Sequence, residues 1–441
     1  MRKVYIETYG CQMNVNDTEV VLSILGRNGF ERTENAVEAD VMMANTCSVR
    51  DNAEQRVLGR IEWFNLQRRG RKGVLVGIIG CMAERLKDKL LESGKVDFVA
   101  GPDAYRSLPS LIEAAGSGEG CRIDVTLSRS ETYGDIVPVR LDSNGVSAFI
   151  SIMRGCNNVC SYCVVPYTRG AERSRDFRSI IREACSCAAD GYKEITLLGQ
   201  NVDSYSYTDE NGRTVDFASL LASVAEAVPS MRIRFATSNP QDISDAVLQV
   251  MAGHANVCHH IHLPVQSGSN RILEKMRRRY TREWYLERVA AIRALMPDCA
   301  ITTDVIAGFC SETEENHRDT LDLFGRVGFD AAYMFQYSER PGTLAARKYP
   351  DDVPPEVKTR RLEEIIALQN RLSLESNRRD IGKRFEVLVE GPSKKGAGQL
   401  CGRNSANKMC VWEDSVHKAG DFVSVEVTDC TQATLICRKA E

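Results

Sequence analysis

The first hundred residues alternate between short apolar runs rich in β-branched residues and segments with the spacing of amphipathic helices. The expected strands are 4–9, 41–45, 74–79 and 96–100, and the helices between them are 18–28, 52–68 and 84–91. This alternation predicts an α/β fold with a doubly wound parallel sheet. In such a sheet, ligands bind outside the carboxyl ends of the strands.

A second alternating series follows residue 145. Its six expected strands, separated by helical segments, are 148–153, 194–198, 232–237, 258–263, 300–306 and 331–337. Six βα units predict an incomplete version of the eight-unit barrel, a partial (β/α)6 barrel. Functional groups are then expected at the rim formed by the carboxyl ends of the strands.

An amphipathic helix over 355–379 leads to a different pattern. Five short strands separated by Gly and polar turns are expected at 385–390, 399–403, 408–412, 422–427 and 433–437. They fit a small antiparallel β-barrel, a type that often binds oligonucleotides. The alternative is a simple packing domain, because acidic residues nearly balance the basic residues near the strand ends, which are Lys383, Arg384, Lys394, Lys395, Arg403 and Lys408.

These patterns, together with a segment rich in Gly, Ser and charge at 116–145, predict three domains in the 441 residues. The predicted bounds are an N-terminal domain at 1–118, a linker at 119–144, a central domain at 145–375 and a C-terminal domain at 380–441. A net charge of -3 argues against binding nucleic acid through bulk charge, so an RNA partner must be held by local basic patches. With no apolar run long enough to span a bilayer, we expect a cytoplasmic protein.

Candidate chemistry begins with Cys156, Cys160 and Cys163, which form a C-x3-C-x2-C triplet. Three thiolates can hold three irons of a [4Fe–4S] cluster and leave the fourth open to a non-protein ligand, which points to chemistry at the cluster. A zinc knuckle is the alternative. Tetrahedral zinc needs a fourth Cys or His nearby, and the next histidine is the distant His254.

Three more cysteines, Cys11, Cys47 and Cys81, each lie just past one of the first three expected strands. Because the carboxyl ends of parallel strands meet at one edge of a sheet, the fold should bring these cysteines together. They would form a second three-cysteine metal site, again one ligand short for a cubane. The alternative is three buried structural cysteines, which are common singly.

The triplet, with Tyr162 just before its last cysteine, resembles the signature of radical S-adenosylmethionine (SAM) enzymes. In that family the open iron chelates the amino and carboxylate groups of SAM. Polar and glycine residues after the other expected strands suit close approach to bound SAM, although ordinary βα turns use the same residues. The candidate cofactor-binding residues are Tyr162, Gln200, Asn201, Ser238, Asn239, Gln266, Asp304 and Gly308.

The order of the parts resembles the methylthiotransferase family over nearly the whole chain, with a C-terminal module similar to that family's TRAM domain. The local motifs that carry the resemblance are Asn45-Thr-Cys-Ser-Val-Arg, Met153-Arg-Gly-Cys-Asn-Asn, Leu263-Pro-Val-Gln-Ser-Gly-Ser and Tyr337-Ser-Glu-Arg-Pro-Gly-Thr. Within the family, the segment Tyr162-Cys-Val-Val-Pro-Tyr-Thr-Arg-Gly is most similar to the branch that acts on N6-isopentenyladenosine in tRNA.

The resemblance implies two [4Fe–4S] clusters and SAM as cofactors. Catalytic Cys156, Cys160 and Cys163 would hold the cluster that cleaves one SAM to a radical, and the other three cysteines would hold an auxiliary cluster carrying the sulfur. A second SAM would supply the methyl group that completes a methylthio group on carbon 2 of the adenine. The implied partners are the tRNA anticodon arm and an electron donor such as flavodoxin or ferredoxin, and we expect a monomer.

Two alternatives stay open. Within the same class, the substrate could be threonylcarbamoyl-adenosine in tRNA or an aspartate of a ribosomal protein; Val164, Val165 and Tyr167 argue against both. From a different class, the chain could be a non-catalytic iron–sulfur protein that binds RNA or senses a signal. The three-ligand spacing of the triplet argues against that.

Overall fold

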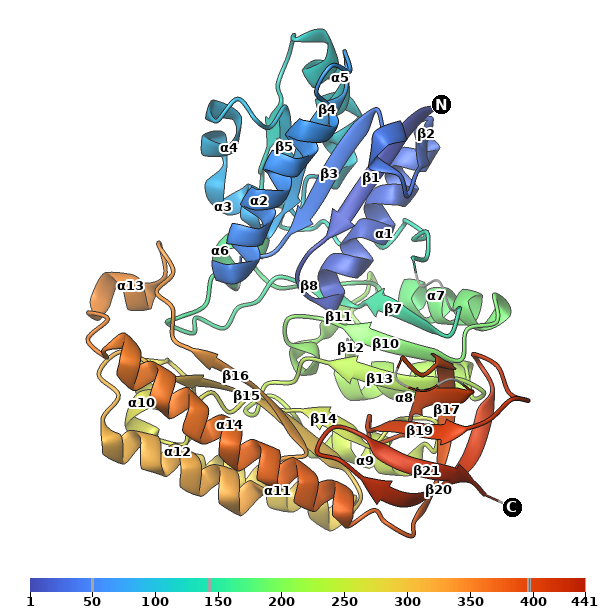
Figure 1. Cartoon of the computed structure of the whole chain (residues 1–441), viewed down its shortest axis with the longest axis vertical. Coiled ribbons are helices and arrows are strands. Elements are labelled where there is room, and N and C mark those ends of the chain that lie inside the picture. Colours follow the sequence, from blue (N-terminus) through green and yellow to red (C-terminus); the bar gives the residue numbers. More distant parts are fainter. Residues whose placement is uncertain (49–50, 142–144, 395, 397, 441) are drawn as a thin grey trace. The chain divides into compact units, whose positions relative to one another are not determined.

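The computed structural model describes the chain except residues 49–50, 142–144, 395, 397 and 441 (Figure 1). The end of the predicted linker, Lys395 and the last two residues of the Asn45 motif therefore lie outside the described residues. The chain forms two compact units. Unit 1 comprises Met1–Leu141, Ser151–Val159 and Cys163–Ser179, and unit 2 comprises Asp142–Ile150, Cys160–Tyr162 and Ile180–Glu441.

Unit 1 contains a six-stranded sheet in the order β2-β1-β3-β4-β5-β6, and all its pairs are parallel. The strands are β1 (Arg2–Thr8), β2 (Phe30–Arg32), β3 (Val41–Thr46), β4 (Leu75–Gly80), β5 (Phe98–Ala100) and β6 (Ile123–Asp124). The predicted parallel sheet is confirmed. The short edge strands β2 and β6 were not predicted, because two or three residues carry no periodicity to detect.

Helices cover both faces of this sheet (Figure 1). They are α1 (Gln12–Arg27), α2 (Asp51–Gln67), α3 (Cys81–Leu86), α4 (Asp88–Glu92) and α5 (Leu108–Ser117). Val21 of α1 and Ile112 of α5 belong to one buried apolar cluster, whereas Phe64 of α2 and Met82 of α3 belong to another. Every residue of β3 and β4 is buried, as expected for central parallel strands packed on both faces.

Six strands in two sheets form the predicted partial barrel. One sheet has the order β13-β10-β7 and the other β14-β15-β16. A single parallel bridge between Ile233 and Val257 connects β13 to the segment before β14. The strands are β7 (Ser147–Ser151), β10 (Glu194–Leu198), β13 (Arg232–Ala236), β14 (His260–His262), β15 (Ala300–Ala307) and β16 (Ala331–Gln336).

Four helices of this part begin where the sequence supplies capping residues. Asp216, Ser244, Thr281 and Thr313 each accept a hydrogen bond from the backbone N–H three residues later. A cap of this kind satisfies one of the free N–H groups at the start of a helix. The helices are α7 (Phe177–Ala189), α8 (Phe217–Ala227), α9 (Asp245–Gly253), α10 (Asn270–Lys275), α11 (Arg282–Leu295) and α12 (Glu314–Val327).

The short helix α13 (Leu344–Lys348) and the long helix α14 (Pro355–Arg378) precede a closed barrel of five strands in the order β17-β18-β19-β21-β20. The strands are β17 (Arg384–Pro392), β18 (Gln399–Arg403), β19 (Met409–Glu413), β20 (Phe422–Cys430) and β21 (Leu435–Lys439). The predicted barrel is confirmed, with the difference that β19 and β21 pair in parallel. Closure leaves no free sheet edge. No helix among the described residues has the length and hydropathy to cross a membrane.

Two buried arginines of β13 attach the C-terminal barrel to the rest of unit 2. Arg232 donates to the carbonyl oxygens of Arg403 and Glu386, each at 2.7 Å. Arg234 donates to the carbonyls of Asn404 (2.8 Å) and Ser405 (3.0 Å), and its Nε donates to the carboxylate of Glu194 (2.8 Å). The C-terminal barrel is therefore an integral part of unit 2.

Replacing Arg234 with Ala should destabilise unit 2 by about 3 to 5 kcal/mol, because it leaves the buried carboxylate of Glu194 without its cation. The control is Arg288→Ala, since Arg288 pairs with Asp245, whose side chain is 74% exposed; an exposed pair contributes about 1 kcal/mol or less. Urea unfolding followed by circular dichroism measures both. Equal midpoints for the two variants would contradict the role of Arg234 as an anchor.

Candidate functional site

The three N-terminal cysteines lie at the ends of adjacent strands. Cys11 is the N-cap of α1 after β1, Cys47 directly follows β3, and Cys81 starts α3 directly after β4. Because β1, β3 and β4 are neighbours in the sheet, all three cysteines lie at its carboxyl edge. The chain order reverses between β1 and β3, and ligands bind at such a switch point.

Two glycines bring the loops of this edge together. Gly10 has a φ of 121°, and a Cβ there would lie 2.6 Å from Cβ of Cys47. Gly80 has a φ of 89°, and a Cβ there would lie 2.5 Å from Oδ1 of Asn45. Any other residue would combine backbone strain with a steric clash at either position.

Buried hydrogen bonds fix the loops from below. Asn14 Nδ2 donates to the carbonyl of Thr46 (2.9 Å), and Asn45 Nδ2 donates to the carbonyl of Asn14 (2.8 Å) and to Oγ1 of Thr18 (2.9 Å). The Cys11 thiol lies 3.3 Å from Oδ1 of Asn14. Fully satisfied buried networks of this kind hold one geometry, so the cysteine loops are rigidly supported.

A buried cation lies beside these cysteines. Burial raises the pKa of the Cys81 thiol, and the positive charge of Arg169, from α6 (Val165–Arg169), acts in the opposite direction. Arg169 donates to Asp17 (2.8 Å), which also accepts from Arg154 (2.7 Å). Burial favours the neutral acid, but the two guanidinium groups hold the pKa of Asp17 below its usual range.

Within the described chain, no three His, Cys, Asp or Glu side chains converge on a point where one metal ion could sit. In a cubane cluster each thiolate binds a different iron, so the cysteines do not need to converge on one atom. The shared sheet edge, the glycine approaches and the adjacent cation fit an anionic cluster bound by Cys11, Cys47 and Cys81.

The C-x3-C-x2-C loop runs between β8 (Met153–Arg154) and α6. Gly155 has a φ of 74°, and a Cβ there would lie 2.1 Å from the carbonyl oxygen of Ala171, so the loop entrance admits only glycine. Sγ of Cys156 accepts from the N–H of Asn158, and Sγ of Cys163 accepts from the N–H of Val165, each at 3.4 Å. Hydrogen bonds to sulfur favour the thiolate that an iron ligand requires.

Arg278, which the sequence did not single out, contacts the second cysteine of the triplet. Its Nη1 donates to Sγ of Cys160 (3.3 Å), and its Nη2 lies 3.3 Å from Oδ1 of Asn239. Its Nε donates to the hydroxyl of Tyr280 (2.9 Å). The guanidinium therefore connects a candidate cluster ligand with a candidate SAM-binding residue.

Four of the candidate cofactor-binding residues follow β10 and β13, namely Gln200, Asn201, Ser238 and Asn239. Oε1 of Gln200 and Oδ1 of Asn201 are covered and, within the described part of the chain, have no hydrogen-bond partner. Leaving buried acceptors unsatisfied costs about 1 to 3 kcal/mol each. A ligand that brings N–H and O–H donors, as the ammonium and ribose hydroxyls of SAM would, fits these oxygens.

Asp203, also missed from the sequence, lies beside this pair of loops. It accepts from the backbone N–H of Asn239 (3.1 Å). Burial raises its pKa to about 7, against the opposing hydrogen bond from the N–H of Asn239. Asp203 lies in the polar stretch after β10, where no local sequence pattern indicates that its carboxyl group is covered.

Of the remaining candidates, Gln266 follows β14, Asp304 lies within β15, Gly308 follows β15 and Tyr162 lies in the triplet loop. Gln266 has a φ of 68° and donates its N–H to the carbonyl of Asp304 (2.8 Å). The Asp304 carboxylate lies 3.4 Å from Nε2 of His262. Tyr162 packs against the apolar cluster that contains Phe309. Each of these three residues is therefore held by contacts within unit 2.

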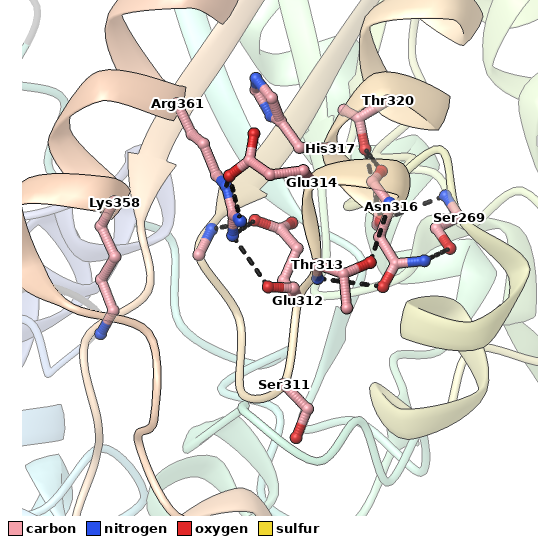
Figure 2. A network of polar contacts seen from close by, with 12 residues as sticks. Ser269, Ser311, Glu312, Thr313, Glu314, Asn316, His317, Thr320, Lys358 and Arg361 are labelled. Atoms are coloured by element: carbon pink, nitrogen blue, oxygen red, sulfur yellow. Dashed lines mark hydrogen bonds and ion pairs between the residues drawn. The ribbon is translucent and has the colours of Figure 1, made fainter.

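Gly308 is held by a buried ion pair. It has a φ of 72°, and a Cβ there would lie 2.3 Å from Cγ of Lys358. Its N–H donates to the carboxylate of Glu312 (2.7 Å), which also accepts from Arg361 of α14 (3.0 Å) (Figure 2). Burial raises the pKa of Glu312, while Gly308 and Arg361 oppose the shift. Glu312 and Arg361 fix the turn that the sequence identified only through its glycine.

Family comparisons agree with this arrangement. Residues 3–101 match the family described as Uncharacterized protein family UPF0004, residues 150–324 match the Radical SAM superfamily, and residues 378–438 match the TRAM domain. Together with the two cysteine sets, these matches define a radical SAM protein that carries a TRAM domain.

Curated relatives extend the match to nearly the whole chain. A tRNA-2-methylthio-N(6)-dimethylallyladenosine synthase of Bacteroides fragilis is 56% identical over 98% of this chain and 95% of its own length. A protein of the same name from Bacteroides thetaiotaomicron is 57% identical over 98% of this chain and 95% of its own length. One from Porphyromonas gingivalis is 54% identical over 98% of this chain and 94% of its own length. The chain belongs to the family of tRNA-2-methylthio-N(6)-dimethylallyladenosine synthases.

Solved structures share the fold at low identity. The radical SAM methyltransferase TsrM from Kitasatospora setae, determined with cobalamin and a [4Fe-4S] cluster, has a TM-score of 0.59 at 16% identity, over 78% of this chain and 74% of that one. The cobalamin-dependent radical enzyme OxsB has a TM-score of 0.55 at 13% identity, over 84% of this chain and 56% of that one. These likenesses support the fold alone.

Replacing Asp203 with Asn should stabilise the protein increasingly as the pH rises. The folded pKa of about 7 lies above the unfolded value of about 3.9, so folding binds a proton and stability falls as pH rises through this window. The Asn variant has no carboxyl group to titrate, so it does not lose this stability. The difference in unfolding midpoint between the variant and the parent should widen between about pH 5 and 7 and then level off. An advantage independent of pH would contradict the burial of this carboxyl.

Replacing Cys156, Cys160 and Cys163 together with Ala should leave about four of roughly eight irons in reconstituted protein and abolish cleavage of SAM to 5'-deoxyadenosine. The matched control replaces Cys185, Cys187 and Cys258, which lie outside both sets. Iron analysis and chromatography of the nucleoside provide the measurements. Continued 5'-deoxyadenosine formation by the first variant would exclude these residues as the catalytic ligands.

Proposed function

We propose that this protein inserts a methylthio group at carbon 2 of N6-isopentenyladenosine next to the anticodon of tRNA. The observation that carries the proposal is the 54–57% identity with enzymes named for this reaction over nearly the full chain. Carbon 2 has no acidic hydrogen and no leaving group, so the reaction needs cofactors to carry it out. The two three-cysteine sets would bind the clusters that provide this chemistry.

The cofactors are two [4Fe–4S] clusters and SAM, which supply the radical, sulfur-transfer and methyl-transfer chemistry when bound. We assign the first cluster to Cys156, Cys160 and Cys163 and the auxiliary cluster to Cys11, Cys47 and Cys81. The proposed residues that bind SAM are Tyr162, Gln200, Asn201, Ser238, Asn239, Gln266, Asp304 and Gly308.

Each group of protein side chains then has a defined task. Arg278 contacts both Cys160 and Asn239 through one guanidinium group and so fixes their relative positions. Gln200 and Asn201 offer covered acceptors for the donors of SAM. Glu312 and Arg361 keep the Gly308 turn open for close approach of the cofactor, since the hydrogen bond to Glu312 fixes its peptide.

The C-terminal module, which we bound at 380–441, would contribute to holding the tRNA. Arg384 and Lys394 are exposed, but Arg384 lies near Glu426 (3.6 Å) and Arg403 pairs with Glu390 (2.6 Å). Lys408 is a structural residue, because its Nζ bonds to Asp380 (2.6 Å) inside unit 2. Most of the described basic side chains near the strand ends are therefore paired, which favours recognition by shape and stacking over bulk attraction.

We further propose the domain bounds 1–118 and 145–375 for the N-terminal and central parts, joined by the linker 119–144. The enzyme would act in the cytoplasm as a monomer and take electrons from a small donor such as flavodoxin or ferredoxin. The tRNA substrate supports a cytoplasmic location, since tRNA is cytoplasmic. The radical SAM cluster supports the need for an electron donor, since reductive cleavage of SAM consumes an electron.

The function is tested with reconstituted protein, SAM, a chemical reductant and three substrates: tRNA with N6-isopentenyladenosine, tRNA with threonylcarbamoyl-adenosine and a ribosomal-protein peptide containing the candidate aspartate. Mass spectrometry of nucleosides and peptide should show a methylthio group on isopentenyladenosine alone.

Replacing Cys47 with Ala should stop the insertion while 5'-deoxyadenosine continues to form. A methylthio group on either of the other substrates alone would overturn the assignment.

A further inference from the structure

Arg169 belongs by sequence to the radical SAM segment and by structure to the surroundings of the N-terminal cysteines. It ends α6, six residues after Cys163. Within unit 1, α6 packs against α3, whose first residue is Cys81 (Figure 1). The segment that carries a proposed ligand of one cluster therefore also delivers a guanidinium to the site of the other.

The guanidinium of Arg169 is buried but incompletely satisfied. The residue is 3% exposed, and its Nη2 donates to Asp17 (2.8 Å). Its Nη1 is covered and has no hydrogen-bond partner among the residues that the structure describes. The helix that ends at Arg169 packs against the helix that begins at Cys81, and the charge of Arg169 opposes the rise in pKa that burial causes for the Cys81 thiol. A buried cation with a free donor is unfavourable unless an acceptor completes it.

The charges around Arg169 do not balance without an anion. Three buried guanidinium groups, those of Arg154, Arg169 and Arg173, share the two carboxylates of Asp17 and Asp103. Arg154 directs its other nitrogen to the carbonyl of Pro102 (2.9 Å). Arg173 bonds to both oxygens of Asp103. Nε of Arg154 also has no hydrogen-bond partner among the described residues, but it lies 3.6 Å from the carboxylate of Asp103. The free donor of Arg169 belongs to the helix that packs against the helix of Cys81.

We propose that Arg169 is a positioning residue of the auxiliary cluster, donating from Nη1 to a cluster sulfur or to the Cys81 thiolate. This inference rests on the proposed cluster site at Cys11, Cys47 and Cys81. A hydrogen bond and a positive charge favour the state with one more electron, so Arg169 raises the reduction potential of this cluster. The positive charge of Arg169 would also help to retain an anionic sulfur species bound to this cluster.

The test uses the full-length chain with Cys156, Cys160 and Cys163 replaced by Ala, so that only the auxiliary cluster remains. In this parent, Arg169→Gln should lower the reduction potential by about 59 mV or more, which is a tenfold change for one electron. Arg169→Lys keeps the charge but loses the planar guanidinium group, so its reduction potential should lie between those of the parent and Arg169→Gln. Redox titration followed by electron paramagnetic resonance measures the potentials.

Arg154→Gln is the matched control, because it removes an equally buried partner of Asp17 but leaves Arg169 in place. It should leave the potential within the error of the parent. Equal potentials for the parent and Arg169→Gln, or equal shifts for Arg154→Gln and Arg169→Gln, would reduce Arg169 to a packing role. If Arg169→Gln retains no iron, an unchanged potential in Arg169→Lys overturns the proposal. A parent that binds no iron would instead overturn the cluster site itself.

Discussion

The carboxyl edge of the parallel sheet is the constraint on which this molecule depends. Parallel strands place residues far apart in the sequence at the same edge, and this brings Cys11, Cys47 and Cys81 together without any local motif. The same rule positions the loops after β10, β13, β14 and β15 in unit 2. Most of the candidate site residues lie in loops, while strands buried on both faces provide the rigidity that holds those loops.

The parts that the sequence predicted well are those with strong periodicity or close spacing. Long apolar strands, the partial barrel and the C-x3-C-x2-C loop needed only local patterns. Residues that act through tertiary contacts could not be found in this way. Arg278 lies in a run of three arginines that is typical of a solvated surface, and Lys408 looked like an RNA contact but is tied to Asp380. The covered carboxyl of Asp203 depends on the packing of two loops, which no window of sequence contains.

Buried arginines recur at each place where the chain must connect parts with different tasks. Arg169 and Arg154 share Asp17, Arg278 joins Cys160 to Asn239, and Arg361 supports Glu312. A guanidinium has five donors in a fixed plane, so it can satisfy several acceptors at once and determine their relative positions. This property explains why lysine would be a poor substitute at these positions despite its equal charge.

The contacts between β13 and the C-terminal barrel have an evolutionary consequence. Arg232 and Arg234 contact the barrel mainly through carbonyl oxygens of residues 386 and 403–405, and every amino acid has a carbonyl oxygen. Mutations of side chains on the barrel can therefore accumulate without loosening its attachment. Natural variation can therefore change the outer surface of this module while its attachment to β13 stays the same.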